Sequence, residues 1–335
     1  MKMGLSRGRT ELIDSLNRRI TYLRVSLTED CNFRCDYCYG SGDKPDMIKQ
    51  RMSNKDISRI IPIFASLGIN KIRFTGGEPL LRKGIIDIVR KTSDLNGIAT
   101  IGMTTNGYRL SRLLGSLIDA GLNRLNISLD TLNRKNFKAI TGIDGLDRVC
   151  SSIDEAEKSG ALEYVKINSV IMRGINDSEI PRFVEWALPR KIDLRFIEFM
   201  PTDQSGWGEH LYVSEDEIKN KTGINLKEIP SGDQGSGPAR SYRYENYPGR
   251  ISFISAVSRC FCDGCNRLRL TARGELLGCL FQDRKIDLKE FLVSGLTDEK
   301  IAENIRLAVN VPEFRRSPGD VSIADTEPFM RGIGG

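Results

Sequence analysis

Three cysteines near the amino terminus, Cys31, Cys35 and Cys38, have a spacing that suits an iron-sulfur cluster. Such clusters are normally held by four cysteine thiolates, so three would leave one iron with an open coordination position. A small molecule bound at that position can react there, which distinguishes a catalyst from an electron carrier. The spacing alone also allows a structural zinc loop or buried free thiols.

The pattern C-x3-C-x2-C, with Tyr37 before the last cysteine, resembles the signature of the radical S-adenosylmethionine (SAM) enzymes. The resemblance implies a 4Fe-4S cluster whose open iron chelates the amino and carboxylate groups of SAM. Gly76, Gly77 and Glu78 stand in the run Thr-Gly-Gly-Glu-Pro, which is similar to the motif that contacts the SAM amino group in these enzymes. The two glycines would let the backbone approach a ligand and open its NH groups, although the motif alone would be an ordinary strand-to-helix turn.

A second group of three cysteines lies in the carboxy-terminal third of the chain. Cys262 and Cys265 are separated by two residues, and Cys279 follows after thirteen more. Zinc usually takes four protein ligands, or three and a water, and the only histidine, His210, is distant in the sequence. A fourth zinc ligand would have to be another cysteine or a carboxylate, so zinc remains open at this point.

The two triplets together resemble the GTP 3′,8-cyclase family of molybdenum cofactor biosynthesis over nearly the whole chain. The resemblance implies a second 4Fe-4S cluster whose open iron faces the guanine base. It also implies that SAM is split to a 5′-deoxyadenosyl radical, which removes hydrogen from C3′ of GTP before C3′ attacks C8. The product would be 3′,8-cyclo-7,8-dihydroguanosine 5′-triphosphate.

The same resemblance assigns roles residue by residue. The cluster ligands would be Cys31, Cys35, Cys38, Cys262, Cys265 and Cys279. The SAM-binding residues would be Tyr37, Gly76, Gly77, Glu78, Ser128 and Met200. The GTP-binding residues would be Arg24, Arg73, Thr104, Lys166, Arg267, Leu268 and Arg269. Direct catalytic roles would belong to the first three cysteines with Arg267 and Arg269.

The run Asn266-Arg-Leu-Arg-Leu alternates basic and apolar residues, as expected of a strand. A strand turns Arg267 and Arg269 to the same face. Guanidinium groups present a planar fork of donors that suits phosphate oxygens, so the pair could clamp a triphosphate. The run taken alone would be a half-exposed strand with a solvated face.

Cys260 departs from the family pattern, and we expect it to be a spectator. A strand would turn Cys260 and Cys262 to one face without bringing both to one metal, and a ligand role would close the second cluster to guanine. Cys150 is expected to be a small buried apolar residue. The ending Gly334-Gly335 is similar to a family tail that enters the active site. On this reading, deletion of the two glycines is expected to abolish turnover while both clusters stay intact. Without the resemblance, such an ending would be read as a disordered tail.

The spacing of apolar residues predicts the elements that would position these groups. Short apolar runs alternate with amphipathic stretches from Ile20 to Phe199, which is typical of β-α units around a parallel sheet. We expect strands at Tyr22–Leu27, Lys71–Phe74, Ala99–Met103, Arg124–Ser128, Val165–Ile171 and Asp193–Phe199. We expect helices at Lys55–Leu67, Gly84–Thr92, Arg109–Ala120, Asp147–Ser159 and Ile180–Leu188, with Asn54 and Ser178 capping the first and last. In β/α barrels the chemistry lies at the carboxyl ends of strands, and the first cysteine loop directly follows the first strand.

The predicted fold class is α/β: a partial (β/α)6 TIM-like barrel of the radical SAM type with a smaller carboxy-terminal cluster-binding module. A length of 335 residues suggests two domains, and the strand-helix rhythm ends after Phe199, so we expect the barrel in residues 1–200 and the module in 201–335. A hydrophobic content of 39% and a charged content of 28% are typical of a soluble globular protein. With neither a membrane-spanning run nor a secretion signal in the sequence, we expect a cytoplasmic protein with reduced thiols.

Partners follow from charge and from the resemblance. The net charge of +6 fits an anionic nucleotide at least as well as nucleic acid. The resemblance implies GTP as the substrate and a one-electron reductant of flavodoxin or ferredoxin type. It also implies a homodimer whose product passes to cyclic pyranopterin monophosphate synthase. We expect no membrane partner and no nucleic-acid partner. One alternative is a peptide-modifying radical SAM maturase, which usually has more carboxy-terminal cysteines. The other is a zinc-containing nucleic-acid-binding protein, which leaves the Gly-Gly-Glu-Pro motif unexplained.

Overall fold

A computed structural model describes residues 11–39, 51–200, 208–230, 238–259, 262–280 and 284–315 of the chain. The strands in these ranges are β1 Leu12–Ile13, β2 Arg19–Ile20, β3 Tyr22–Ser26, β4 Lys71–Thr75, β5 Thr100–Thr105, β6 Arg124–Ser128, β7 Val165–Ile171, β8 Ile192–Glu198, β9 Lys227–Ile229, β10 Arg240–Arg243, β11 Arg250–Ile254, β12 Arg267–Leu270, β13 Glu275–Leu277 and β14 Lys285–Asp287. The α-helices are α1 Asp36–Tyr39, α2 Asn54–Ser66, α3 Ile85–Ser93, α4 Leu114–Asp119, α5 Arg134–Thr141, α6 Leu146–Lys158, α7 Ile180–Ala187, α8 Glu215–Lys221, α9 Leu288–Val293 and α10 Asp298–Val309. The 3-10 turns are η2 Pro79–Leu81, η3 Leu110–Arg112, η4 Asp177–Glu179, η5 Glu209–Leu211 and η6 Pro312–Phe314.

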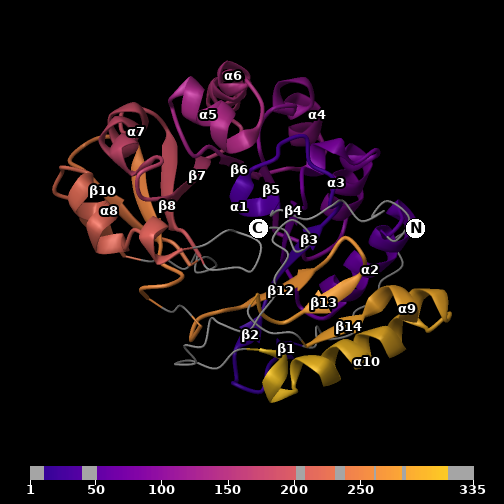
Figure 1. Ribbon diagram of the computed structural model, residues 1–335. Helices are drawn as coiled ribbons and strands as arrows, with labels where there is room; N and C mark the ends of the chain where they lie inside the picture. The colour runs from indigo at the N-terminus through magenta and orange to yellow at the C-terminus, as the bar shows by residue number, and fades with distance from the viewer. Residues whose placement is uncertain are drawn as a thin grey trace.

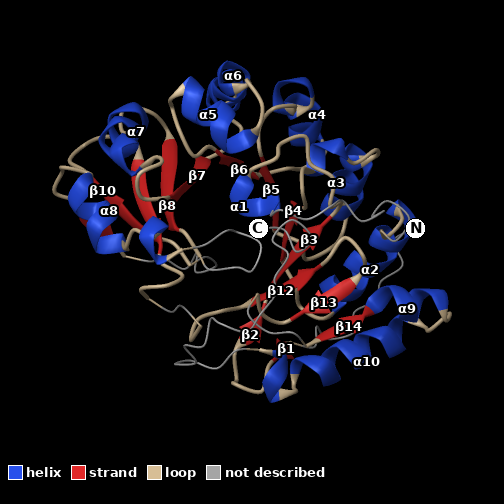
Figure 2. Cartoon of the chain, viewed as in Figure 1, coloured by secondary structure: helices blue, strands red, loops and turns tan. Residues whose placement is uncertain are grey.

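One curved sheet organises the chain, in the order β14-β13-β12-β3-β4-β5-β6-β7-β8-β11-β10-β9. From β12 to β11 each strand runs parallel to its neighbour. Helices α2 to α7 lie along the outer side of the arc and the strands along its inner side (Figures 1 and 2). The predicted α/β class and its six strands, now β3 to β8, are confirmed, and the sheet is an open barrel that ends at β14 and β9.

The two faces of the sheet differ in chemistry. In β7 the residues Val165, Ile167 and Ile171 are fully buried, whereas the alternate residues Lys166 and Asn168 are half-buried. The apolar residues pack with the helices in one hydrophobic core, because successive side chains of a strand point to opposite faces. Parallel strands that are buried on both faces are normally apolar throughout. A polar inner face therefore indicates that this side of the sheet surrounds a ligand rather than a core.

The carboxy-terminal part of the chain extends this sheet at both ends, with β12 beside β3 and β11 beside β8. Helix α10 also lies against α2, where Arg59 donates hydrogen bonds to Asp298 at 2.8 Å and to the Leu296 carbonyl at 2.5 Å. Strands from before and after residue 200 belong to the same sheet, so the sheet itself does not mark a domain boundary there. The division into residues 1–200 and 201–335 stays a prediction. No helix in the described ranges is long and apolar enough to cross a membrane.

Both predicted helix caps are wrong. Helix α2 is capped by Ser53, whose hydroxyl accepts from the Asp56 NH, whereas the Asn54 side chain accepts from Arg82 at 2.9 Å. Ser178 lies inside η4, and α7 begins after it without a side-chain cap. In each case a competing hydrogen bond or turn one residue away determines where the helix begins. The spacing of apolar residues alone does not locate a helix start to within one residue.

Two helices also differ from the sequence prediction. The expected helix Arg109–Ala120 is divided into η3 and α4 at Leu113, which is not helical. Helix α5 was not expected, because its eight residues are mostly polar. Its buried side chains, chiefly Phe137 and Ile140, give too short an apolar pattern to detect from sequence.

Candidate functional site

The first cysteine loop follows β3 at the carboxyl end of the sheet. Cys31, Cys35 and Cys38 are half-buried, and the Cys38 NH donates to the Cys35 carbonyl at 2.9 Å as α1 begins. The sulfur of Cys31 accepts from the Phe33 NH at 3.4 Å and from the side-chain amide of Asn106 at 3.8 Å. The loop therefore gathers three thiols, one of them already held by NH donors.

Burial makes these thiols weak acids. Burial, with the nearby charges of Glu78 and Cys38, raises the pKa of Cys31 to about 12. Burial and the carboxylate of Asp130 raise the pKa of Cys35 well above its usual range. Each loss of a proton would also raise the pKa of the neighbouring thiols, so the loop needs a bound cation to hold three thiolates.

The Gly-Gly-Glu-Pro loop after β4 packs directly on the first cysteine loop. The Gly77 NH donates to the Thr28 carbonyl at 2.6 Å, and the Glu78 NH donates to the Asp30 carbonyl at 2.7 Å. A Cβ on Gly76, which has φ +151°, would lie 2.4 Å from the Thr28 oxygen, and one on Gly77 would lie 2.3 Å from the Asp30 oxygen. The backbone therefore makes a close approach to the cysteine loop, and these two NH groups bind that loop rather than open toward a ligand; the predicted contact of the glycines with SAM stays a prediction.

Glu78 joins the loops after β4 and β5. Its buried carboxylate accepts from the Thr105 hydroxyl at 2.7 Å, the Asn106 NH at 2.7 Å and the Leu80 NH at 3.0 Å. Burial still raises its pKa to about 7. The Glu78 carboxylate therefore holds Asn106 in position, and the Asn106 side chain in turn donates to the Cys31 sulfur.

Tyr37 is fixed from the opposite side of the loop. Its hydroxyl donates to Asp130 at 2.6 Å, and the other oxygen of Asp130 accepts from the Val170 NH at 2.8 Å. Burial raises the pKa of Asp130 to about 6 and that of Tyr37 well above its usual range. The Tyr37 ring meets Phe199 edge-on at 6.5 Å between centroids. These contacts connect the cysteine loop to the ends of β6, β7 and β8.

The remaining SAM-binding predictions lie at the same end of the sheet. Ser128 ends β6, and Met200 stands two residues after β8. The sequence prediction missed Asn106 and Asp130, which contact the cysteine loop directly. The available signal was a polar residue one or two positions beyond a strand, the usual location of functional groups in such folds.

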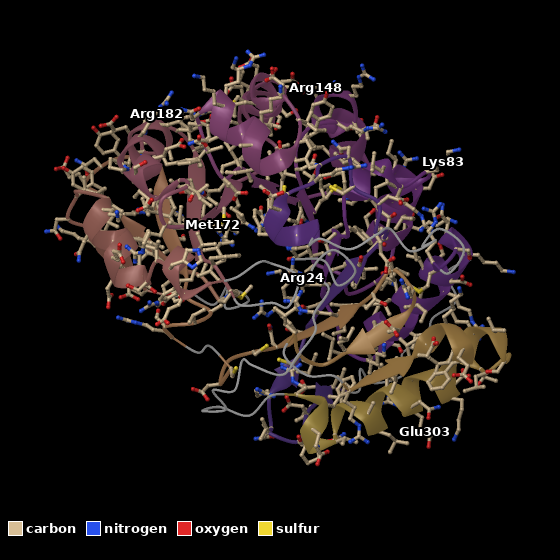
Figure 3. The ribbon with its side chains drawn as sticks, viewed as in Figure 1. Arg24, Lys83, Arg148, Met172, Arg182 and Glu303 are labelled. Carbon is tan, nitrogen blue, oxygen red and sulfur yellow. The ribbon has the colours of Figure 1, made fainter. Side chains whose placement is uncertain are left out.

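The inner face of the sheet carries two rows of basic residues. In one row, register places Arg269 beside Arg24 and Arg24 beside Arg73. In the other, Arg267 lies beside Tyr22, whose other neighbour is Lys71. Gly102 completes the first row, where any Cβ would lie 2.9 Å from the Arg73 guanidinium. Five predicted or neighbouring cations from three strands therefore share one small surface, and Figure 3 shows Arg24 near the middle of the molecule.

Arg73 is buried and the other four cations are half-buried, and the five repel one another. Burial and the charge of Arg269 lower the pKa of Arg24 to about 9, and burial and Arg267 lower that of Arg269 to about 10. Burial would raise the pKa of Tyr22, but Arg73 and Arg24 outweigh it and lower the value to about 7. Arg73 itself donates to the Tyr22 hydroxyl at 2.8 Å. Such an excess of buried positive charge is costly unless an anionic ligand compensates it.

Further along the inner face, Lys166 lies 3.9 Å from Asp193, and burial with the charge of Arg195 lowers its pKa to about 7. The buried Thr104 hydroxyl and the side-chain amide oxygen of Asn168 find no hydrogen-bond partner within the described ranges. Buried polar atoms of this kind are normally satisfied, often by a ligand or an ordered water. The predicted contacts of Thr104 and Lys166 with the nucleotide stay predictions, and both residues lie on the inner face of the sheet.

Leu268 differs from its two neighbours in the predicted GTP-binding run. Its side chain is fully buried in the hydrophobic core, on the face opposite Arg267 and Arg269. Any contact of this residue with a ligand on the inner face would involve its backbone.

The second cysteine loop lies at the amino end of β12. Burial would raise the pKa of Cys265, but the charges of Arg267 and Arg315 outweigh it and lower the value to about 7. Cys265 and Cys279 both act electrostatically on Arg269, which brings the predicted ligands and the predicted phosphate clamp together. Cys260 and the Gly334-Gly335 ending lie outside the described residues.

Two arginines from the ends of the chain hold this loop. Arg18 donates to the Cys262 carbonyl at 2.8 Å, and Arg315 donates to the Cys265 carbonyl at 2.5 Å. Both arginines pair with the buried carboxylate of Asp14 at 2.7 Å. A buried Arg-Asp-Arg group therefore fixes the backbone of the second loop, and none of its members was expected from the sequence.

The residues around the two groups of cysteines are compatible with two iron-sulfur clusters. In the part of the chain that the structure describes, no three Cys, His, Asp or Glu side chains converge on a single ion site. Ligands of a 4Fe-4S cluster bind different iron atoms, so they stand further apart than the ligands of one zinc. The three thiols of the first loop, with NH donors on Cys31, and the pair Cys262 and Cys265 with Cys279 after β13, with basic groups around Cys265, suit cluster ligation.

Comparison with known proteins agrees with this geometry. Residues 25–187 match the Radical SAM superfamily, and residues 192–316 match the family described as Molybdenum Cofactor Synthesis C. The protein named GTP 3′,8-cyclase of Thermodesulfovibrio yellowstonii is 45% identical, covering 87% of this chain and 91% of the relative. The one of Heliobacterium modesticaldum is 40% identical, covering 97% of this chain and 100% of the relative.

This chain belongs to the GTP 3′,8-cyclase family. Its mitochondrial relative in Arabidopsis thaliana is 44% identical over 89% of this chain and 77% of the relative. In the mouse relative, named Molybdenum cofactor biosynthesis protein 1, the 40% identical region covers 89% of this chain and 47% of the relative. The chain thus spans about half of that longer protein. Membership corrects both alternatives, the peptide-modifying maturase and the zinc-containing nucleic-acid-binding protein.

The chain also shares its fold with a solved protein of much lower sequence identity. A crystal structure of Streptococcus suis SuiB bound to S-adenosylmethionine matches with a TM-score of 0.60 and 16% identity, covering 87% of this chain and 69% of that one. At this identity the match shows the fold alone. It agrees with the open barrel of β3 to β8 and its outer helices.

Proposed function

We propose that this chain is a radical SAM lyase that joins C3′ to C8 of GTP, giving 3′,8-cyclo-7,8-dihydroguanosine 5′-triphosphate in the first step of molybdenum cofactor biosynthesis. Relatives named for this activity match most of the chain. The observation that carries the proposal is the buried excess of positive charge on the inner face of the sheet. A nucleoside triphosphate supplies the negative charge that this surface needs.

The two cysteine loops support the arrangement of the reactants. They lie at opposite ends of the adjacent parallel strands β3 and β12, one after Ser26 and the other before Arg267. A five-residue strand spans about 16 Å, so the basic surface lies between the loops. GTP held there would have its base toward the second loop and its ribose toward the first.

The cofactors would be two 4Fe-4S clusters and SAM. When bound, the first cluster supplies the electron that splits SAM into methionine and a carbon radical, and the second offers an open iron to guanine. Cys31, Cys35 and Cys38 would hold the first cluster, and Cys262, Cys265 and Cys279 the second. SAM would lie against Tyr37, Gly76, Gly77, Glu78, Ser128 and Met200.

The chain's own residues bind and orient the substrate. Arg24, Arg269 and Arg267 would hold phosphate oxygens, and Arg73 would share this task while it donates to Tyr22. Thr104 and Lys166 would contact the nucleotide from β5 and β7, and Leu268 through its backbone. Because a carbon radical reacts with nearly any neighbour, fixed orientation and exclusion of water would be the main contribution of these groups.

The proposal extends to partners and location. A flavodoxin or ferredoxin would deliver the electron, the chain would act as a homodimer, and the product would pass to cyclic pyranopterin monophosphate synthase in the cytoplasm. The barrel would occupy residues 1–200 and the cluster-binding module residues 201–335.

Anaerobic reconstitution tests the function. With iron and sulfide we expect about eight irons per chain, and with SAM, GTP and dithionite we expect 5′-deoxyadenosine and a cyclised GTP product. The variant Arg269→Gln should weaken GTP binding at least about 10-fold while SAM binding stays normal, because a charge-assisted phosphate contact is worth about 1.5–3 kcal/mol. Arg182→Gln, on the exposed face of α7, is the matched control. SAM cleavage without a GTP product in the parent protein would refute the substrate assignment.

A further inference from the structure

A hollow of about 320 Å³ lies on the outer rim of the sheet, beside the loop that follows β5. It is lined by Leu80, Tyr108, Arg109, Arg112, Leu113 and Arg148. Three of these six residues are cationic and none is acidic. Arg109 and Arg112 are exposed, and the Arg148 guanidinium stacks on the Tyr108 ring at 4.3 Å. The function proposed above gives no role to this surface.

The hollow is connected to the first cysteine loop by short contacts. The Tyr108 ring meets the Phe33 ring at 5.8 Å between centroids, and the Phe33 NH donates to the Cys31 sulfur at 3.4 Å. On a second route, the Tyr108 NH donates to the Asn106 side chain at 3.0 Å, and Asn106 donates to the same sulfur at 3.8 Å. Two residues therefore lie between the hollow and the predicted ligand Cys31 on each route: Tyr108, and then either Phe33 or Asn106.

The positive charge of the hollow is not neutralised by the acids nearby. Asp144 and Asp147 line an adjoining hollow, but both pair with Arg134, at 2.8 and 2.9 Å. In the described part of the chain, Arg109, Arg112 and Arg148 form no ion pair with an acid. Figure 3 shows Arg148 at the outer margin of the molecule, whereas Arg24 lies near its middle. The rim surface is thus accessible from outside while the basic inner face would be occupied by substrate.

We propose that this hollow, with Arg109, Arg112 and Arg148, is the docking surface for an acidic one-electron carrier protein that reduces the first cluster. The inference rests on the proposed function, because it needs a cluster on Cys31, Cys35 and Cys38. The reduced carrier loses one electron and the cluster gains it, so no bond forms and no proton moves. Transient redox complexes have small, polar interfaces, and opposite charges speed their encounter.

The test is the rate at which the reconstituted cluster is reduced, followed by its loss of visible absorption in anaerobic stopped flow. The electron donors are a reduced acidic flavodoxin and, separately, dithionite. In Arg112→Glu/Arg148→Glu we expect reduction by flavodoxin to slow at least about 10-fold at low salt, and the difference to shrink as salt rises. Reduction by dithionite should be unchanged. Arg109 is left intact because its charge acts on the buried Glu78.

Arg182→Glu/Lys191→Glu is the matched control, since it changes the net charge equally on exposed residues at and beyond α7. The first cluster of this control variant should be reduced by both donors at nearly the rate seen in the parent protein. The milder Arg112→Gln/Arg148→Gln should show an intermediate effect with flavodoxin. Equal flavodoxin rates in the parent and the rim variants would overturn the proposal, as would a rim variant that loses dithionite reduction as well. Because cluster reduction is measured without GTP, failure of the cyclase assignment would appear separately, as absence of the GTP product with dithionite.

Discussion

The two cysteine loops use the same ligand type in opposite electrostatic surroundings. The first is buried near the carboxylates of Glu78 and Asp130, and the pKa of Cys31 is raised to about 12. The second lies among arginines, and the pKa of Cys265 is lowered to about 7. Metal ligation requires thiolates, so assembly at the first loop must displace tightly held protons. In the second loop the Cys265 thiol, with a pKa lowered to about 7, loses its proton more readily before any iron binds.

The loops also differ in how they are anchored. The first is held by neighbouring β-α loops, through Gly77, Glu78 and Asp130. The second is held by Arg18 and Arg315, which lie near opposite ends of the described chain and share Asp14. The first site is therefore anchored within the barrel, whereas the second is anchored by residues from both ends of the described chain.

Removal of one ligand from each loop should give the largest contrast. Cys35→Ser should lower the iron content from about eight to about four per chain and abolish SAM cleavage, a loss of at least about 1,000-fold. Cys265→Ser should lower the iron content equally but retain SAM cleavage while it loses the cyclised product. Iron analysis and chromatography of 5′-deoxyadenosine measure both effects. SAM cleavage in Cys35→Ser would contradict the assignment of the first loop.

The next largest difference between the two loops should be in the reactivity of their thiols in the metal-free protein. Because the thiolate is the nucleophile, iodoacetamide at pH 7.5 should modify Cys265 about 100-fold faster than Cys31, after allowance for the lower nucleophilicity of a low-pKa thiolate. The Cys265 rate should fall as the pH drops through about 7, where its proton returns. Arg267→Gln should slow it by raising the pKa. Peptide mass spectrometry follows both sites, and equal rates would show that the two surroundings do not differ as described.

The anchors should differ in their contribution to stability. Asp14→Ala leaves two buried arginines without their carboxylate and should cost about 3–5 kcal/mol of unfolding free energy. Asp130→Ala should cost less, about 1–3 kcal/mol, because burial already raises the pKa of Asp130 to about 6 and so disfavours its charge. Urea unfolding of the metal-free variants compares them. A larger loss in Asp130→Ala would reverse the proposed ranking.

The smallest effect concerns one glycine in or beside each cysteine loop. A Cβ on Gly77 would lie 2.3 Å from the Asp30 oxygen, whereas a Cβ on Gly264 has no atom within 4 Å. Gly77→Ala should therefore cost about 1–3 kcal/mol, and Gly264→Ala should stay within about 0.5 kcal/mol. Thermal denaturation together with iron content is the measurement. An unchanged Gly77→Ala protein would mean that the close packing of the two loops is not needed.

Much of the fold could be predicted because parallel strands leave a local signal. Short apolar runs between amphipathic stretches identified β3 to β8 within one or two residues. Helix starts were less predictable, since Ser53 rather than Asn54 caps α2 once Arg82 occupies the Asn54 side chain. Helix α5 escaped detection because few of its residues are buried. The local sequence pattern therefore located the strands and most helices, but not the hydrogen bonds that fix where a helix begins.

By itself, the sequence determined the chemistry: two cysteine triplets, the Gly-Gly-Glu-Pro turn and the basic strand around Arg267 are local patterns whose residue types already restrict what can bind. Only the tertiary structure decided the surroundings of those groups. Arg24, Arg73 and Arg269 share one surface because the register of three strands brings them together. Asp14 reaches Arg315 because β1 and α10, from opposite ends of the described residues, pack together. Charge acts through space over a few ångströms, whatever the separation along the chain, so the pKa of each thiol could be read only from the folded protein.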